Sequence, residues 1–188
     1  MKTTSLEDWK GKIAILIIPS DLYVYISNEI QVELVKEWGM EGMVISANKP
    51  YLTMKEYLQK NDVLKRLVYL DCASRFVGVN PQGENLVLLS SPSNLVELAI
   101  HIEKNTRDFS KENFLLFDSL TTLLIYNKTE DLTRFAHKLG LKMKSMNITT
   151  FFLIVDQETT RDMLKFLSTI ADKIAHVSVN NKGEVYSD

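Results

Sequence analysis

The chain has 188 residues, of which 45% are hydrophobic and 24% are charged, and its formal net charge is −2 at pH 7. A chain of this length can bury a sizeable core without disulfides or a structural metal, so we expect residues 1–188 to form a single domain. The nearly neutral charge argues against a protein that coats nucleic acid or an anionic membrane, and we expect neither partner.

The expected cellular location of the protein rests on three features of its sequence: its apolar runs, its first residues and its cysteine content. The longest aliphatic run, residues 13–18, is far shorter than the roughly 20 residues that span a bilayer. Residues 1–12 are polar and contain no signal-peptide core. Cys72 is the single cysteine and has no partner for an internal disulfide. We therefore expect a cytoplasmic protein.

Several short apolar runs are continuous instead of alternating, which is typical of strands that are buried on both faces. They cover residues 13–18, 43–46, 67–70, 114–117 and 151–155, and a weaker sixth run covers residues 174–179. Strands of this kind belong to a mostly parallel sheet with helices on both faces. We expect their side chains to be inaccessible to solvent, including those of Ile15, Ile17, Leu116 and Leu153.

Helical patterns with start signals lie between these runs. Asn28 as an N-cap, Gln31 three residues later and Gly39 as a stop predict a helix over residues 28–38. Further start signals are Thr53 with Glu56, Ser91 with Pro92, Thr129, and Thr159 or Thr160. The repeated order of strand and helix predicts an α/β fold in which right-handed crossovers place helices on both faces of the sheet.

Residues 72–90 interrupt this order and are too many for a routine connection. The sequence Asn80-Pro81-Gln82-Gly83 supplies turn chemistry between two short apolar stretches. We interpret the region near residues 75–89 as an inserted hairpin that carries Phe76, Val77 and Val79. If the domain does not cover these side chains, they form an apolar contact site for a protein partner.

Ligands of open α/β sheets bind beyond the carboxyl ends of the strands. The loop that follows the first predicted strand, residues 19–27, contains neither glycine nor lysine. A loop that binds phosphate groups needs both. We expect Tyr23 or Tyr25 to fill the space where phosphates would lie. The fourth run ends in Asp118, which Ser119 follows. An aspartate at the end of a buried strand can hold Mg²⁺ through water in nucleoside triphosphatases; alternatively, the carboxylate caps nearby backbone N–H groups.

No other cluster of residues predicts chemistry. Cys72 has no histidine near it in sequence, and the three histidines are scattered along the chain. We therefore expect no catalytic residue, no cofactor site and no metal site.

Residues 115–124, which read Leu-Leu-Phe-Asp-Ser-Leu-Thr-Thr-Leu-Leu, resemble the Walker B strand of the RecA superfamily and the segment that follows it. Residues 68–74 and 146–155 resemble two further strands of the KaiC-like branch. The resemblance extends from about residue 12 to residue 179. The sequence is also similar to uncharacterised archaeal KaiC-related domains that lack the phosphate loop. The resemblance implies a RecA-like three-layer sandwich with strand order about 3-2-4-5-1, any sixth strand lying beyond the first.

The chain departs from the family at the positions that handle ATP. The glycine-rich Walker A loop is absent, and the family's water-activating glutamate is replaced in a stretch where neither Ala47 nor Asn48 is a general base. We interpret Asp118 and Ser119 as a degenerate Walker B remnant and expect no ATPase activity.

Three functions remain open on these grounds. The first is a non-catalytic RecA-like module that acts through protein contacts, as a regulator, a scaffold or an assembly subunit, with a protein partner or by self-association. The alternative is a nucleotide-binding KaiC-like protein with a non-standard site at Asp118 and Ser119, although we do not expect nucleotide binding. The third is an unrelated small-molecule enzyme that uses Asp71, Cys72 or Asp118 at the strand ends.

Overall fold

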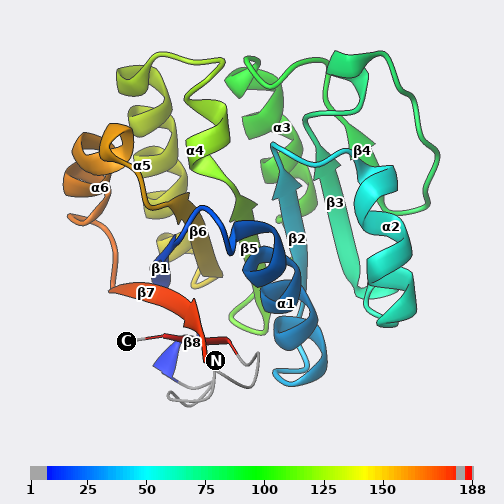
Figure 1. The fold of residues 1–188 in the computed structure, drawn as a ribbon, viewed down its shortest axis with the longest axis horizontal. Coiled ribbons are helices and arrows are strands. Elements are labelled where there is room, and N and C mark those ends of the chain that lie inside the picture. The colour runs from blue at the N-terminus through cyan, green and yellow to red at the C-terminus, as the bar shows by residue number, and fades with distance from the viewer. Residues whose placement is uncertain (1–7, 181–184, 188) are drawn as a thin grey trace.

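A computed structural model of the protein describes residues 8–180 and 185–187 (Figure 1). Both ends of the expected 1–188 domain, residues 1–7 and 188, lie outside the described residues, as does the segment 181–184. The strands are β1 (Ile13–Ile18), β2 (Glu41–Ser46), β3 (Leu67–Asp71), β4 (Leu86–Leu88), β5 (Asn113–Asp118), β6 (Thr149–Val155), β7 (Lys173–Val179) and β8 (Val185–Ser187). The α-helices are α1 (Tyr23–Lys36), α2 (Tyr51–Lys60), α3 (Leu95–Asn105), α4 (Leu120–Leu123), α5 (Thr129–Ser145) and α6 (Arg161–Leu167). Short 3₁₀ helices are η2 (Leu64–Arg66), η3 (Arg75–Val77) and η4 (Glu158–Thr160).

The strands form one sheet in the order β4-β3-β2-β5-β6-β1-β7-β8. Strands β1 to β7 are parallel to their neighbours, and β8 pairs antiparallel with β7. The six predicted strands correspond, in chain order, to β1, β2, β3, β5, β6 and β7. The expected order 3-2-4-5-1, with the sixth strand beyond the first, is therefore the observed order β3-β2-β5-β6-β1-β7 and is confirmed. The fold is therefore the expected α/β three-layer sandwich, and the parallel strands end at a common carboxyl edge, toward which β2 points upward in Figure 1.

Each central strand supplies side chains to two separate cores. In β1, Ala14, Leu16 and Ile18 face the core beneath α1 and α2, whereas Ile13, Ile15 and Ile17 face the core beneath α3 to α6. This division explains the continuous apolar runs, because a strand covered on both faces has no solvent side. The four side chains predicted to be inaccessible, Ile15, Ile17, Leu116 and Leu153, are all buried.

The expected hairpin near residues 75–89 is wrong. Residues 75–77 form η3, and β4 pairs parallel with β3, with Tyr69 opposite Leu86. The chain bends directly after β3 because the Asp71 carboxylate accepts hydrogen bonds from the backbone N–H groups of Ala73 and Ser74, each at 2.8 Å. These local bonds favour a helical turn over an extended strand. Gly78 ends η3 in the left-handed conformation, with φ of 80°.

Helix α1 also begins earlier than predicted, at Tyr23 instead of Asn28. Its N-cap residue, Leu22, makes no side-chain cap hydrogen bond. The first turn is instead stabilised by burial of Tyr23 and Ile26 against the sheet. Tertiary packing therefore determines this end of the helix, and it brings Tyr23 and Ser27 to the carboxyl edge. Across the described part of the chain, none of the helices has the length and apolar character that a membrane span requires.

Candidate functional site at the carboxyl edge of the sheet

Asp118 is the last residue of β5, and its side chain is 0% exposed. Ser119 follows as the N-cap of α4, and its hydroxyl accepts the backbone N–H of Thr122 at 3.3 Å. Ser119 is also fully buried. The two residues predicted as the Walker B remnant are therefore adjacent at the carboxyl edge, but solvent does not reach either of them.

Helix α1 supplies two hydroxyl donors to the Asp118 carboxylate. The Tyr23 hydroxyl donates to Oδ1, and the Ser27 hydroxyl donates to Oδ2 at 2.6 Å. These residues are four apart, so they lie on the same face of the helix. Tyr23 is buried as expected, whereas Tyr25, the other tyrosine predicted for this space, is exposed.

The loop after β2 adds a buried lysine. Lys49 Nζ lies 3.8 Å from Asp118 Oδ2 and donates to Ser27 Oγ and Asn28 Oδ1, each at 3.1 Å. Its ammonium also lies 5.6 Å from the centre of the Tyr23 ring. An ammonium and a carboxylate thus offset each other's charge at the carboxyl edge of the sheet.

The electrostatics of this cluster favour a closed hydrogen-bond network. Burial raises the pKa of the Tyr23 hydroxyl well above 10.0, and the adjacent Asp118 charge raises it further. The hydroxyl therefore remains a donor. Burial lowers the pKa of Lys49 from 10.5, while the attraction of Asp118 acts in the opposite direction. We refer to Tyr23, Ser27, Lys49 and Asp118 as the Asp118 network.

A second buried aspartate lies at the same level of the sheet. Ser46 of β2 is opposite Asp71 of β3 on one side and opposite Asp118 of β5 on the other. Asp71 Oδ2 accepts the backbone N–H of Tyr51 at 2.7 Å, and it also accepts the Ser74 hydroxyl. With the N–H groups of Ala73 and Ser74 on Oδ1, this carboxylate fixes the loops after β2 and β3.

Cys72 follows Asp71 and is fully buried. Burial raises the pKa of its thiol, and the nearby Asp71 charge raises it further. A thiol in these surroundings is disfavoured as a thiolate nucleophile. Within residues 8–180 and 185–187, no three His, Cys, Asp or Glu side chains gather in an arrangement that could hold a metal ion.

The expected contact residues lie at the same edge and are exposed. Phe76 is 52% exposed and Val77 is 60% exposed, and Val79 is also exposed. The Phe76 ring packs edge-on against Tyr126, with 5.2 Å between ring centres. We call Phe76, Val77, Val79 and Tyr126 the η3 patch. Its side chains lie on a 3₁₀ turn and the loops beside it, not on the hairpin that the sequence predicted.

Sequence reasoning missed the roles of Ser27 and Lys49. Ser27 was read as part of a loop, and it lies in α1. A signal for Lys49 was nevertheless present, because the expected strand order places the end of the second strand directly beside the fourth, which ends in Asp118. A lysine three residues after that strand is within reach of the carboxylate.

Comparisons with known proteins support the fold. No family model and no curated protein matches the sequence. Among solved structures, a KaiC-like protein from the hyperthermophilic archaeon Pyrococcus horikoshii is similar with a TM-score of 0.64 and 13% identity, over 95% of this chain and 78% of that one. An uncharacterised protein from the same organism, solved in complex with an unknown peptide, has a TM-score of 0.65 and 16% identity, over 95% of this chain and 82% of that one. The chain therefore has the KaiC/RecA-like fold.

Proposed function

We propose that this chain, which has the fold of KaiC-like proteins, is a non-catalytic module that acts through protein contacts made by the η3 patch. The observation that carries the proposal is the Asp118 network. Each oxygen of the Asp118 carboxylate accepts a hydroxyl of α1, and Lys49 supplies the cation. The chain's own side chains thus occupy the position that a nucleotide and its metal would need.

Nucleotide binding at Asp118 and Ser119 would require this network to open. The phosphates would have to displace Tyr23, and no glycine in residues 19–27 provides a row of inward N–H donors. Asp21 adds a repelling charge on the same loop. Displacing buried hydrogen-bonded groups without replacing their partners is costly. The nucleotide alternative is therefore less well supported than contact with a protein.

Two observations favour the contact role. The η3 patch gathers large apolar side chains on one exposed surface, which is typical of interaction sites. The uncharacterised Pyrococcus protein with the same fold was solved with a peptide bound. By analogy, we place a polypeptide partner, either another protein or a second copy, on this chain.

Titration with Mg-ATP by calorimetry tests the first half of the proposal. We expect no heat of binding and no ATP hydrolysis above background. Micromolar affinity that is lost in Asp118→Ala would overturn the proposal and favour the nucleotide-binding alternative.

The contact half is tested with Phe76→Asp and the matched control Leu141→Asp, which places the same charge on an exposed leucine of α5. Sedimentation velocity measures self-association, and a photo-crosslinking residue at position 76 or 141 identifies partners in the native host. We expect an association or a crosslink that depends on residue 76 and not on residue 141. Equal behaviour of the two positions would contradict a contact role for the η3 patch.

A further inference from the structure

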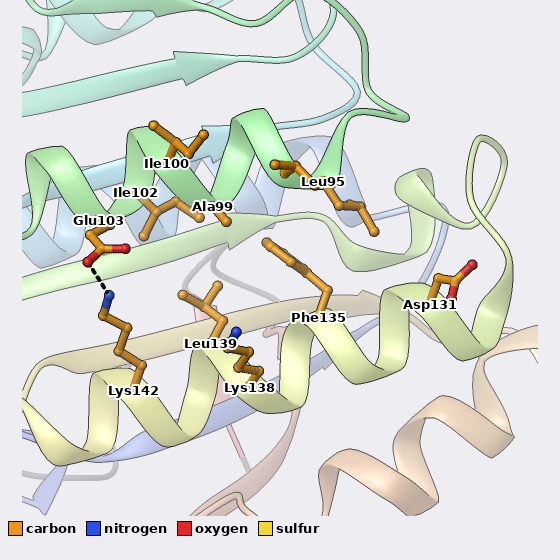
Figure 2. A pocket seen from close by; sticks show the side chains of 11 residues that line it. Leu95, Ala99, Ile100, Ile102, Glu103, Asp131, Phe135, Lys138, Leu139 and Lys142 are labelled. Atoms are coloured by element: carbon orange, nitrogen blue, oxygen red, sulfur yellow. Dashed lines mark ion pairs between the residues drawn. The ribbon is translucent and has the colours of Figure 1, made fainter.

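A groove on the outer side of the helical layer lies between α3 and α5, and the η3 patch is not part of it. Figure 2 shows Ala99 and Ile102 of α3 opposite Phe135 and Leu139 of α5, with Leu95 at one end. The groove has a volume of about 430 Å³, within the range of sites that bind ligands. Seven of the eleven residues that line it are apolar, and the other four, Glu103, Asp131, Lys138 and Lys142, are charged.

Helix α3 carries more apolar surface than the domain uses. Leu98 and Ile102 are buried in the core, yet Val96 and Ile100, which border the groove, are 71% and 60% exposed. A surface helix whose only role is to cover a sheet has polar residues on its outer face. The apolar stripe that continues out of the groove therefore indicates a surface that a partner covers.

The charged residues on the rim of the groove indicate which charge a partner would carry there. Glu103 pairs with Lys142 at 3.0 Å at one end, and Asp131 pairs with Arg134 at 2.7 Å at the other. Lys138 lies on the rim between these pairs, is exposed, and has no ion-pair partner among the described residues (Figure 2). A partner that fills the groove would therefore find one unmatched cation midway along it.

The walls of the groove also indicate the secondary structure of the partner. Both walls are α-helices, whose backbone N–H and C=O groups are already paired within the helix, so the groove has no edge to which an extended peptide could hydrogen-bond. A helix pairs its own backbone groups. Leu95 and Glu103 are eight residues apart on α3, which is about 12 Å at 1.5 Å per residue. This length accommodates apolar side chains at i, i+3 or i+4, and i+7.

We propose that the α3–α5 groove binds an amphipathic helix of a partner protein, with apolar side chains along one stripe and a carboxylate beside that stripe that pairs with Lys138. The proposal concerns a different surface from the η3 patch, so either one can fail without the other.

The test is a selection from a phage-displayed library of helical peptides of about five turns, with one face randomised, against the whole chain. Binders that also bind Ala99→Arg are subtracted, because this change of an exposed residue fills the groove without altering the core. We expect the enriched peptides to have apolar residues at i, i+3 or i+4, and i+7, and an acidic residue flanking them. No enrichment that depends on Ala99, or enrichment of proline-rich extended sequences, would overturn the proposal.

The charge is tested with the best selected peptide in fluorescence anisotropy. Lys138→Glu should weaken its binding about threefold to tenfold, and replacement of the peptide's acidic residue by lysine should restore affinity for Lys138→Glu alone. The matched control, Lys60→Glu, alters an exposed lysine on α2 and should leave binding unchanged. Equal losses of peptide affinity for Lys138→Glu and Lys60→Glu would show only a general charge effect. Displacement of the peptide by dodecanoate at a lower concentration than by unlabelled peptide would indicate a small amphiphile as the ligand. Either result would contradict the proposal.

Discussion

The two aspartates on either side of β2 have the same position in the sheet and different partners. Asp71 accepts three backbone N–H groups and one hydroxyl, from the first residue of α2 and from the segment after β3. Asp118 is bonded by the side chains of α1 and faces the Lys49 ammonium. The first carboxylate holds the backbone in place, whereas the second is surrounded by side chains. A buried acid at a strand end is therefore not by itself a sign of catalysis.

The comparison predicts that Asp71→Ala is the more damaging change. It would leave the buried N–H groups of Tyr51, Ala73 and Ser74 without acceptors, and we expect a loss of about 3 to 5 kcal/mol in the free energy of unfolding. Urea unfolding followed by circular dichroism measures this loss. The exposed Asp108→Ala serves as control and should stay within about 0.5 kcal/mol of wild type. A loss below 1 kcal/mol for Asp71→Ala would mean that water replaces the carboxylate and that the loops do not depend on it.

Asp118→Ala should cost less, about 3 kcal/mol, the lower end of the range for removing one partner of a buried ion pair. It leaves the Lys49 ammonium without its carboxylate, but Ser27 and Asn28 still accept from that lysine, and burial already lowers its pKa toward neutralisation. The double variant Asp118→Ala with Lys49→Met removes both charges and should recover part of the loss. The same urea experiment gives all three values. A loss greater than that of Asp71→Ala would reverse the comparison.

The Asp118 network also predicts a dependence on alkaline pH. The pKa of Tyr23 is raised in the folded chain, so above its ordinary value of 10.0 the unfolded state loses a proton that the folded state keeps. Stability from this group is complete below pH 10 and falls as the pH rises, by about 1.4 kcal/mol per pH unit. Lys49 acts oppositely, but only below its ordinary value of 10.5. Above that pH, Tyr23→Phe should reduce the slope of unfolding free energy against pH by about this amount. Tyr126→Phe, an exposed tyrosine, is the control, and equal slopes in the two variants would count against the buried hydroxyl.

Much of the fold could be predicted because its signals are local. The six apolar runs correspond to six strands, with boundaries that differ from the structure by no more than two residues. The resemblance to KaiC-like proteins supplied the order of the strands, which periodicity alone does not contain. The region after β3 was misread because its turn depends on hydrogen bonds to the Asp71 carboxylate, and turn residues in the sequence fit a hairpin equally well.

The candidate site was less predictable, because its partners meet only across the fold. Asp118 was identified from its place after a buried run, but Ser27 and Lys49 come from two other segments, 91 and 69 residues away. The start of α1 was placed five residues late, at Asn28 instead of Tyr23, and this error left Ser27 in a loop. A helix whose first turn depends on tertiary burial carries no capping signal that a sequence could reveal.

The short outer strand of the sheet has a consequence for how copies of this protein can associate. β4 has three residues, and it lies at the end of the sheet beside β3. An unpaired sheet edge is a template for strand addition and aggregation, and a very short edge strand limits the number of hydrogen bonds that an incoming chain can form. Growth of the sheet by strand addition on this side is therefore disfavoured, and a partner that binds at this edge would contact side-chain surfaces, which can be selective for one partner where an open backbone edge is not.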